Sequence, residues 1–333
     1  MTINHLYIVT HTDLDGVGSA TGALLVTGRS PRDATIVYAE PYNIHEKLRD
    51  IKEYISQGDL LIISDLGPNK ESFGETVKIL EELNNKGVKI EWYDHHVWPR
   101  ELVEKAKATG ANIIIDTSTC ATGVVLRHGS KIHNMEFSKY MEELEAAICA
   151  ADLWRWDHYL APRLFRIADT RYEEGKEAWR NRLVEKFVSG TLWDEELEEK
   201  LHEYVNLELK NFNQTYRNTY VTQAPCRVAA TVKPQGPPSN SFIGASLLSR
   251  YQADIAVIIR DNGGISLRSK NVDVQQIALK LGGGGHPRAA GAKIRIPLLV
   301  NIGRRLLGPR VLSWYAARLV RRVALETGCV HGL

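Results

Sequence analysis

Five short apolar runs in the first third of the chain are separated by segments in which apolar and polar positions follow a helical pattern. The runs are LYIVT at 6–10, TIVYA at 35–39, LLIIS at 60–64, VKIEWY at 88–93 and NIIID at 112–116. Runs of this composition are typical of strands, and their alternation with helices predicts a parallel sheet covered by helices on both faces. We therefore expect an α/β domain whose ligands bind beyond the carboxyl ends of the strands.

The pattern changes twice in the rest of the chain. Between about 138 and 222 it is helical and rich in charge, as in DEELEEKLHEY at 194–204, which predicts a set of helices. The proline- and glycine-rich segment at 231–241 then marks a loop inside or at the edge of a second domain. The strand-like DIAVIIR at 254–260, the turn DNGG and the run ISLRS at 265–269 predict a hairpin in that domain.

Composition narrows the class of protein. The 333 residues are 44% hydrophobic and 25% charged, an ordinary globular composition with enough chain for two domains. The N-terminal segment lacks the basic and apolar regions of a secretory signal, and no apolar run approaches the length that spans a bilayer. The four cysteines are scattered and form no CxxC pair, so they indicate neither a zinc site nor a disulfide framework. They are Cys120, Cys149, Cys226 and Cys329. We expect a cytoplasmic protein.

The basic charge of the chain is concentrated at its C-terminal end. The net charge is +2, but residues 301–333 hold six arginines against the single acid Glu326, which makes this tail +5 and leaves −3 for the rest. Apolar residues recur in the tail at helical spacing and predict an amphipathic helix. Two interpretations remain open: a helix docked on the second domain with a solvated basic face, or an electrostatic guide for nucleic acid or a membrane surface.

Acidic and imidazole side chains follow three of the predicted strands. His11, Asp13 and Asp15 come directly after the first strand, Asp65 after the third, and the segment YDHH at 93–96 after the fourth. In an extended segment the first three would share one face, because side chains alternate with period two. Each motif alone fits an ordinary turn or helix cap. Together they predict a metal site at one edge of the sheet.

Oxygen-rich ligation with one or two imidazoles favours Mn²⁺ or Mg²⁺ over Zn²⁺. Two such ions about 3.5–4 Å apart polarise a phosphoryl group and generate a hydroxide nucleophile. A further carboxylate, Asp152, ends a helical stretch in the segment AADLW. The ligand types therefore favour a site for Mn²⁺ or Mg²⁺, and a pair of such ions would suit the hydrolysis of a phosphate ester.

The motifs HTDLDG, SDLG, YDHH and AADLW resemble, in this order, the four signature motifs of the DHH phosphoesterase superfamily. The segment LGGGGHPRAAG at 281–291 and the upstream SLRS at 266–269 resemble the signatures of its subgroup with a DHH-associated C-terminal domain, in the oligoribonuclease and RecJ-like exonuclease branch. The resemblance covers about residues 1–295. It implies a DHH catalytic domain at 1–175 and a smaller α/β DHH-associated domain at 223–300. The charge-rich helical pattern places a helical connector between them at 176–222, and the basic amphipathic helix at 301–333 lies beyond the resemblance.

The resemblance also implies roles for the residues of the N-terminal motifs. His11 and Asp13 would bind one metal ion, Asp15, His95 and Asp152 would bind the other, and Asp65 would bridge both. His96 would face the phosphate, and Asp94 would orient His95. Asp157 is an alternative to Asp152, although the alanines before Asp152 match the motif better.

Glycine-rich residues in the C-terminal motif are candidates for substrate binding. Consecutive glycines let backbone amides approach a phosphate closely, and the basic side chains beside them add positive charge. Arg268 would add a bidentate donor. The alternative for the glycines alone is a flexible loop. The candidate substrate-binding residues are Arg268, Gly283, Gly284, Gly285, His286 and Arg288.

These features together favour a metal-dependent hydrolase of phosphodiester bonds. The first choice is an exonuclease or oligoribonuclease-like enzyme that acts on short single-stranded RNA or DNA from the 3′ end with two Mn²⁺ ions, or with Mg²⁺. One alternative is a hydrolase of cyclic dinucleotides or 3′-phosphoadenosine-5′-phosphate. The other is a non-catalytic nucleic-acid-binding subunit, whose sign would be the loss of metal-ligand positions.

Overall fold

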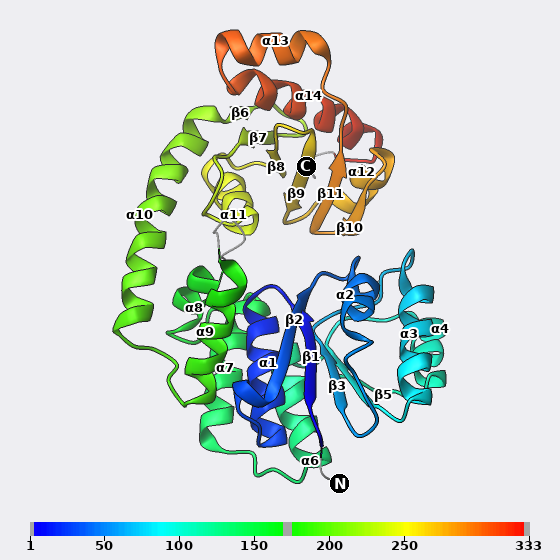
Figure 1. Ribbon diagram of the computed structural model, residues 1–333. Helices are drawn as coiled ribbons and strands as arrows, with labels where there is room; N and C mark the ends of the chain where they lie inside the picture. The colour runs from blue at the N-terminus through cyan, green and yellow to red at the C-terminus, as the bar shows by residue number, and fades with distance from the viewer. Residues whose placement is uncertain (1–2, 169–174, 330–333) are drawn as a thin grey trace. The chain divides into compact units, whose positions relative to one another are not determined.

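A computed structural model describes residues 3–168 and 175–329 of the chain. The chain divides into two compact units, residues 1–201 and 202–333, which are described separately (Figure 1). The division falls inside helix α10, Glu195–Asn218. Within the described ranges, no helix combines the length and apolar content that would be needed to cross a membrane.

A five-stranded parallel sheet forms the centre of the first unit. Its strands are β1 (Leu6–His11), β2 (Ala34–Ala39), β3 (Leu60–Ser64), β4 (Lys89–Asp94) and β5 (Asn112–Ile115), in the order β2-β1-β3-β4-β5. All four pairings are parallel. These strands confirm the five predicted ones to within one residue at each end, because each is a short run of residues that suit a sheet buried on both faces.

Helices surround this sheet. They are α1 (Leu14–Thr27), α2 (Ile44–Ile51), α3 (Phe73–Asn85), α4 (Arg100–Ala108), α5 (Ala121–Val124), α6 (Ser130–Ile132), α7 (Lys139–Asp152), α8 (Ala161–Ala168) and α9 (Lys176–Val188), with the 3₁₀ turn η1 (Pro31–Asp33) and the π-helical turn η2 (Val125–Gly129) between α5 and α6. Helix α1 is buried almost throughout and contacts β1, α5, α7 and α9. A Cβ atom on Gly18 would lie 2.3 Å from side chains of both α5 and α7. Small residues on α1 thus bring these helices close to the carboxyl end of β1.

The second unit contains a mixed sheet. Its strands are β6 (Tyr220–Val221), β7 (Val228–Val232), β8 (Ile255–Ile259), β9 (Gly264–Ser269), β10 (Gly284–His286) and β11 (Ala289–Lys293), in the order β10-β11-β9-β8-β7-β6. Strands β7 and β8 are parallel and the other neighbours are antiparallel. The predicted hairpin is confirmed as β8 and β9. The fold class is therefore as expected, a parallel α/β unit followed by a smaller mixed α/β unit.

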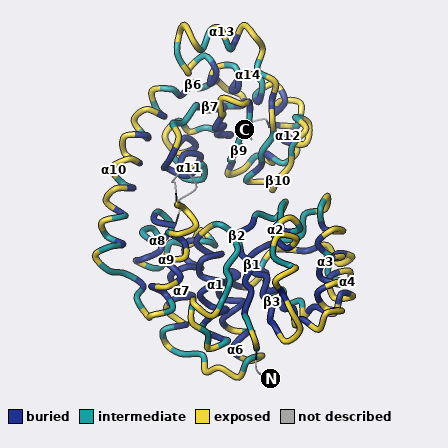
Figure 2. The backbone as a smooth tube through the Cα atoms, viewed as in Figure 1, coloured by how far each residue is buried: buried dark blue, intermediate teal, exposed yellow. Residues whose placement is uncertain are grey.

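Two separate cores cover the faces of the second sheet. Helix α11 (Asn240–Arg250) packs on one face through Ile243 and Leu247. Helices α12 (Val274–Lys280) and α14 (Arg310–Glu326) pack on the other, where Leu312 and Val320 of α14 are fully buried (Figure 2). Helix α14 of the tail therefore docks on the second unit, as the first of the two interpretations expected.

Two expectations about the C-terminal half and the cysteines are corrected. The basic tail forms two helices, α13 (Leu298–Leu307) and α14, where one was expected. Gly308 has a φ of 91° and Pro309 lacks a donor for a continuous helix, so the chain turns between them. The cysteines form two disulfides, Cys120–Cys149 and Cys226–Cys329. Their partners are 29 and 103 residues apart, and spacing in the sequence does not reveal such pairs.

Candidate active site

The first strand and the first helix position three of the candidate ligands. His11 is the last residue of β1, Asp13 is the N-cap of α1, and Asp15 lies in the first turn of that helix. Asp13 accepts a hydrogen bond from the backbone N–H of Gly16, and this cap starts the helix at once. The expectation that all three share one face of an extended segment is wrong, because the change to helical geometry turns Asp15 away from the other two.

Asp15 is a buried carboxylate bound by the start of α5. Its two oxygens accept hydrogen bonds from the backbone N–H groups of Ala121 (2.7 Å) and Thr122 (2.8 Å), and the Thr122 hydroxyl donates a third. Amides at the start of a helix satisfy a negative charge well. Asp15 is thereby held in one orientation.

Asp152 is the last residue of α7, at the end of a helix as the sequence predicted.

Asp65 has a left-handed backbone immediately after β3. Its φ is 56°, which is unfavourable for a residue with a Cβ. Its N–H donates to the carbonyl of Tyr93 on the neighbouring strand, and the next carbonyl, of Leu66, accepts from the Trp92 indole. These contacts hold the turn, and the carboxylate of Asp65 is only 3% exposed.

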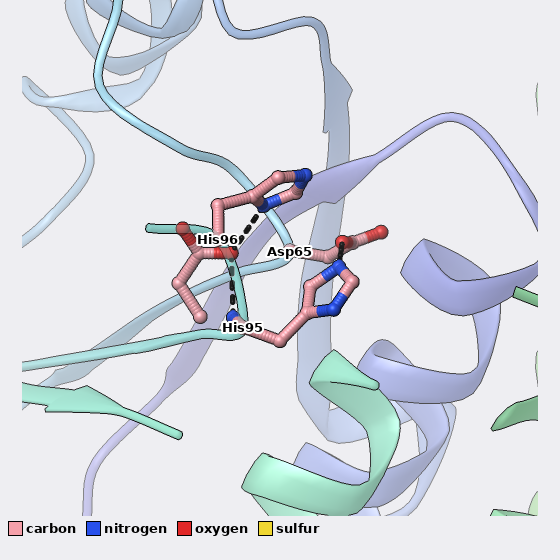
Figure 3. Close-up of side chains that lie close together, drawn as sticks. Asp65, His95 and His96 are labelled. Carbon is pink, nitrogen blue, oxygen red and sulfur yellow. Dashed lines mark hydrogen bonds and ion pairs between the residues drawn. The ribbon is translucent and has the colours of Figure 1, made fainter. Parts of the chain in front are cut away.

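The segment after β4 carries the paired histidines. Asp94 Oδ1 lies 2.8 Å from Nδ1 of the His96 ring and accepts the backbone N–H of His95, while its Oδ2 accepts the Trp98 indole N–H. Asp94 therefore orients the ring of His96, and the expectation that it orients the ring of His95 is corrected. The reason is local geometry: His95 points its ring toward Asp65, away from the carboxylate that binds its backbone (Figure 3).

Two groups of side chains flank Asp65. On one side, Nδ1 of His11 lies 3.6 Å from Asp65 Oδ2 and 2.9 Å from Asp13 Oδ2. On the other, Nε2 of His95 lies 3.5 Å from Asp65 Oδ1, 3.9 Å from Asp15 and 3.8 Å from Asp152. In each group the ligand atoms are close enough to surround one metal ion. Asp65 belongs to the first group and presents its other oxygen to the second.

The electrostatics of this cluster fit cations. Burial and the neighbouring charges of Asp15 and Asp13 raise the pKa of Asp65 well above its usual value. Burial, with Asp15 and Asp65 nearby, raises the pKa of Asp152 to about 9. Asp65 Oδ2 and Asp152 Oδ2 are buried oxygens that find no hydrogen-bond partner among the residues that the structure describes. Buried carboxylates that repel one another and lack donors are stabilised when a cation binds between them.

Three residues that hydrogen-bond to the segments of the candidate site escaped the sequence-based search. Glu40 accepts from the Thr12 hydroxyl, and its other oxygen lies 3.2 Å from Nε2 of His11, which leaves Nδ1 of that ring facing the other ligands. The residue directly follows β2, so the rule that found the other strand-end residues would have found it. Arg180 of α9 donates to the carbonyl of Thr12, and Trp98 donates to Asp94. Neither of these two stands in a motif.

Asp157, the alternative to Asp152, lies elsewhere. It pairs with Arg155, and its side chain is 63% exposed. Asp152 is the carboxylate that the structure brings to His95.

The candidate substrate-binding residues belong to the second unit. Gly283 precedes the edge strand β10, whose residues are Gly284, Gly285 and His286, and Arg288 lies in the turn to β11. The glycine-rich segment is thus a strand of a hairpin and not a flexible loop. In the register of the sheet, Ala289 stands opposite both His286 and Arg268, so these two side chains share a face about 10 Å apart.

Arg268 lies over the beginning of α11. Its guanidinium donates to the hydroxyl of Ser241 in the first turn of that helix. A Cβ on Gly244 would lie 2.5 Å from Arg268 Cγ, so this glycine makes room for the arginine. Burial lowers the pKa of Arg268 from its usual value. The arginine offers positive charge, and the helix start and the His286 ring offer donors to an anion.

Comparisons with known proteins agree with this arrangement. Residues 5–151 match the DHH family, N-terminal domain, and residues 237–301 match the DHHA1 domain. The oligoribonuclease NrnB of Bacillus subtilis (strain 168) is 24% identical over 302 residues, which cover 87% of this chain and 72% of NrnB.

Two solved structures share the fold. The pGpG-specific phosphodiesterase PggH from Vibrio cholerae is 18% identical with a TM-score of 0.56, over 94% of this chain and 99% of PggH. RecJ from Thermus thermophilus, in complex with Mn²⁺, is 17% identical with a TM-score of 0.56, over 94% of this chain. The chain spans about half of RecJ, 52% of its length. The chain belongs to the DHH phosphoesterase superfamily, with a DHH domain followed by a DHHA1 domain.

Proposed function

We propose that this protein is a metal-dependent phosphodiesterase that hydrolyses short RNA or DNA oligonucleotides, in the manner of an exonuclease or oligoribonuclease. The observation that carries this proposal is the position of Asp65, whose two oxygens face separate His and Asp groups. The names of the relatives, an oligoribonuclease and a pGpG phosphodiesterase, support short nucleic acids as substrates.

The proposed ligand sets follow from the two groups. His11, Asp13 and Asp65 would hold one divalent ion, and Asp15, His95 and Asp152 would hold the second together with Asp65. Such ions, when bound, polarise the phosphoryl group and lower the pKa of an attacking water. Glu40 accepts the remaining N–H of His11 and so keeps Nδ1 free for ligation. Imidazole ligands and the Mn²⁺ in the RecJ structure support manganese as the preferred ion.

His96 is proposed to act on the substrate itself. Its side chain is 46% exposed, more than the other residues around Asp65 apart from Asp13. The carboxylate of Asp94 raises the pKa of His96, chiefly through the hydrogen bond to its ring. A protonated imidazole held in this way donates to a phosphate oxygen or supplies a proton to the leaving alkoxide.

The second unit is proposed to hold a phosphate away from the scissile bond. Arg268 and His286 share a face of the sheet. The amides of Gly284 and Gly285, with Arg288 beside them, are proposed as further donors, whereas the N–H of Gly283 already donates to the carbonyl of Ala278. Contacts of this kind position the reacting centre with binding energy from the remote part of the substrate. A site that binds one end of a short oligonucleotide favours an exonuclease. We propose that this exonuclease acts from the 3′ end.

One assay tests the proposal. The protein with Mn²⁺ is incubated with end-labelled RNA and DNA of two to twenty-five nucleotides, with cyclic dinucleotides and with 3′-phosphoadenosine-5′-phosphate. Mononucleotides released stepwise from the shorter oligomers are the expected products. Exclusive turnover of the cyclic dinucleotides or of 3′-phosphoadenosine-5′-phosphate would assign the alternative activity. Binding of oligomers without cleavage of any substrate would instead make the chain a non-catalytic subunit.

A further inference from the structure

Helix α13 presents a row of aliphatic side chains to solvent. The exposed residues are Leu298 (74%), Leu299 (81%), Ile302 (45%), Leu306 (78%) and Leu307 (79%). Val300 is the buried residue of this helix. Residues 298, 302 and 306 recur every four positions and therefore lie on one face. An exposed aliphatic row of this size marks a surface that meets an apolar partner.

The helix lies at the edge of its unit. Its main contacts are with α14, and Figure 1 shows it on the side of α14 that faces away from the sheet. The match to the DHHA1 domain ends at residue 301, so the end of α13 and all of α14 lie outside the matched residues. Neither the phosphodiesterase site nor the sheet of the second unit uses this surface.

Positive charge surrounds the aliphatic row. Residues 293–325 contain eight lysines and arginines and no acidic residue. Arg304 pairs with Asp261. Over the described part of the chain, no salt bridge is formed by Arg295, Arg305 or Arg310, and all three are exposed. Arg305 follows Ile302 by three positions and so borders the aliphatic row.

The positive charge and the aliphatic row of α13 together indicate which kind of partner this surface binds. A second copy of the chain would bring like charges together around the leucines, which opposes association. An RNA backbone would pair with the arginines but leave the leucines in water. A bilayer with anionic headgroups satisfies both, because the aliphatic face enters the boundary between headgroups and acyl chains while the arginines remain among the phosphates.

We propose that α13 docks the protein on the surface of an anionic phospholipid bilayer. The helix lies in the plane of the interface, with Leu298, Leu299, Ile302 and Leu306 toward the lipid and Arg305 at the headgroups. The inference is independent of the proposed phosphodiesterase activity, because it uses residues outside both proposed binding sites.

Flotation of the full-length protein with lipid vesicles tests the proposal. The vesicles contain either phosphatidylcholine alone or phosphatidylcholine with phosphatidylglycerol. We expect at least about tenfold stronger partitioning to the anionic vesicles, weakened by salt, since each basic residue near such a surface adds attraction. The variant Leu299→Asp/Leu306→Asp should lose about tenfold or more of this binding. Arg305→Gln/Arg310→Gln should reduce binding to the level seen with neutral vesicles.

A matched control separates docking from a general effect of the substitution. Leu209 on α10 is 58% exposed, and Leu209→Asp should bind vesicles like the wild type. All variants should hydrolyse bis-p-nitrophenyl phosphate normally and melt at the wild-type temperature, which shows that they are folded. Unchanged vesicle binding by Leu299→Asp/Leu306→Asp would overturn the proposal. So would a wild-type dimer in light scattering that becomes monomeric in this variant without any vesicle binding, because a second copy would then cover the face.

Discussion

Asp94 Oδ1 lies 2.8 Å from Nδ1 of His96, and this pair gives the site a histidine whose pKa is raised. The Asp94→Asn variant removes the negative charge but retains the size of the side chain. The pKa of His96 should then fall, so the alkaline limb of the kcat profile should move to lower pH if protonated His96 donates to substrate. A profile of kcat against pH with a dinucleotide substrate measures this shift.

The control for that substitution is a second carboxylate–histidine pair. Asp116 Oδ2 lies 3.0 Å from Nε2 of His128, outside the two groups that flank Asp65. Asp116→Asn should leave the pH profile of kcat unchanged. An unshifted profile in Asp94→Asn would remove His96 from the proton-transfer step.

Replacement of Asp65 should cost more activity than replacement of His11. Asp65 is the proposed shared ligand, so Asp65→Ala disturbs both ions, while His11→Ala disturbs one. We expect a loss of at least about a thousandfold in kcat for Asp65→Ala, the scale of several kcal/mol from metal catalysis. Because an asparagine tolerates the left-handed backbone of residue 65, Asp65→Asn serves as the variant that preserves the fold. Near-wild-type turnover in both would show that the site is misplaced.

Removal of divalent ions should abolish turnover. The proposed ligands are mainly carboxylates with two imidazoles, so added Mn²⁺ should restore activity at least as well as Mg²⁺. The measurement is dinucleotide hydrolysis after dialysis against EDTA, followed by titration with each ion. Full activity in excess chelator would exclude the metal mechanism.

The stability of the metal-free protein should fall as the pH rises. Burial and the charges of Asp15 and Asp65 raise the pKa of Asp152 to about 9 in the folded state, against about 3.9 in an unfolded chain. Between these values the folded state binds more protons than the unfolded state, so the free energy of unfolding decreases with pH. Melting curves in EDTA from pH 5 to 9 test this sign.

Two comparisons complete the melting experiment. Asp152→Asn should flatten the pH dependence, whereas Asp157→Asn, which alters an exposed pair with Arg155, should not. Mn²⁺ should raise the melting temperature more at pH 8 than at pH 6, because the ligands must be deprotonated to bind it. A metal-free protein whose stability rises over this range would contradict the assigned electrostatics.

Replacement of Arg268 should distinguish a role in substrate binding from a role in the chemical step. Arg268→Ala should lower kcat/KM for a dinucleotide or short oligomer by about tenfold to a hundredfold, the scale of one charge-assisted contact of about 1.5–3 kcal/mol. Hydrolysis of bis-p-nitrophenyl phosphate, which has no remote phosphate, should be nearly unaffected. Arg260→Ala in the same unit is the control. Equal losses on both substrates would place Arg268 in the catalytic centre or the fold, and no loss on either would remove it from the substrate site.

Much of the first unit follows from local pattern. Strands such as LLIIS at 60–64 are short apolar runs that need burial on both faces, and their boundaries agree with the structure to within one residue. Because parallel strands align their carboxyl ends, residues far apart in sequence, such as His11, Asp65 and His95, were expected at one edge. The structure brings them together there.

The partners within that edge did not follow from the sequence. The sequence suggested that Asp94 orients the ring of the next residue, His95. In the structure, Asp94 Oδ1 lies within hydrogen-bond distance of the ring of His96, two residues later. Glu40 bears no motif, and its role depends on the approach of β2 to His11. The split of the basic tail into α13 and α14 depends on a single turn at Gly308.

The sequence by itself determined the order of strands and helices, the family, and which side chains stand at strand ends, because these depend on periodicity and on residues close together in the chain. Only the tertiary structure decided which residues each of those side chains contacts. Asp13 caps α1 and faces His11, while Asp15 points to the start of α5 and toward His95. It also paired Cys226 with Cys329 across 103 residues. The physical reason is that side-chain direction and long-range contact depend on helix starts and on the packing of distant elements, which local patterns do not encode.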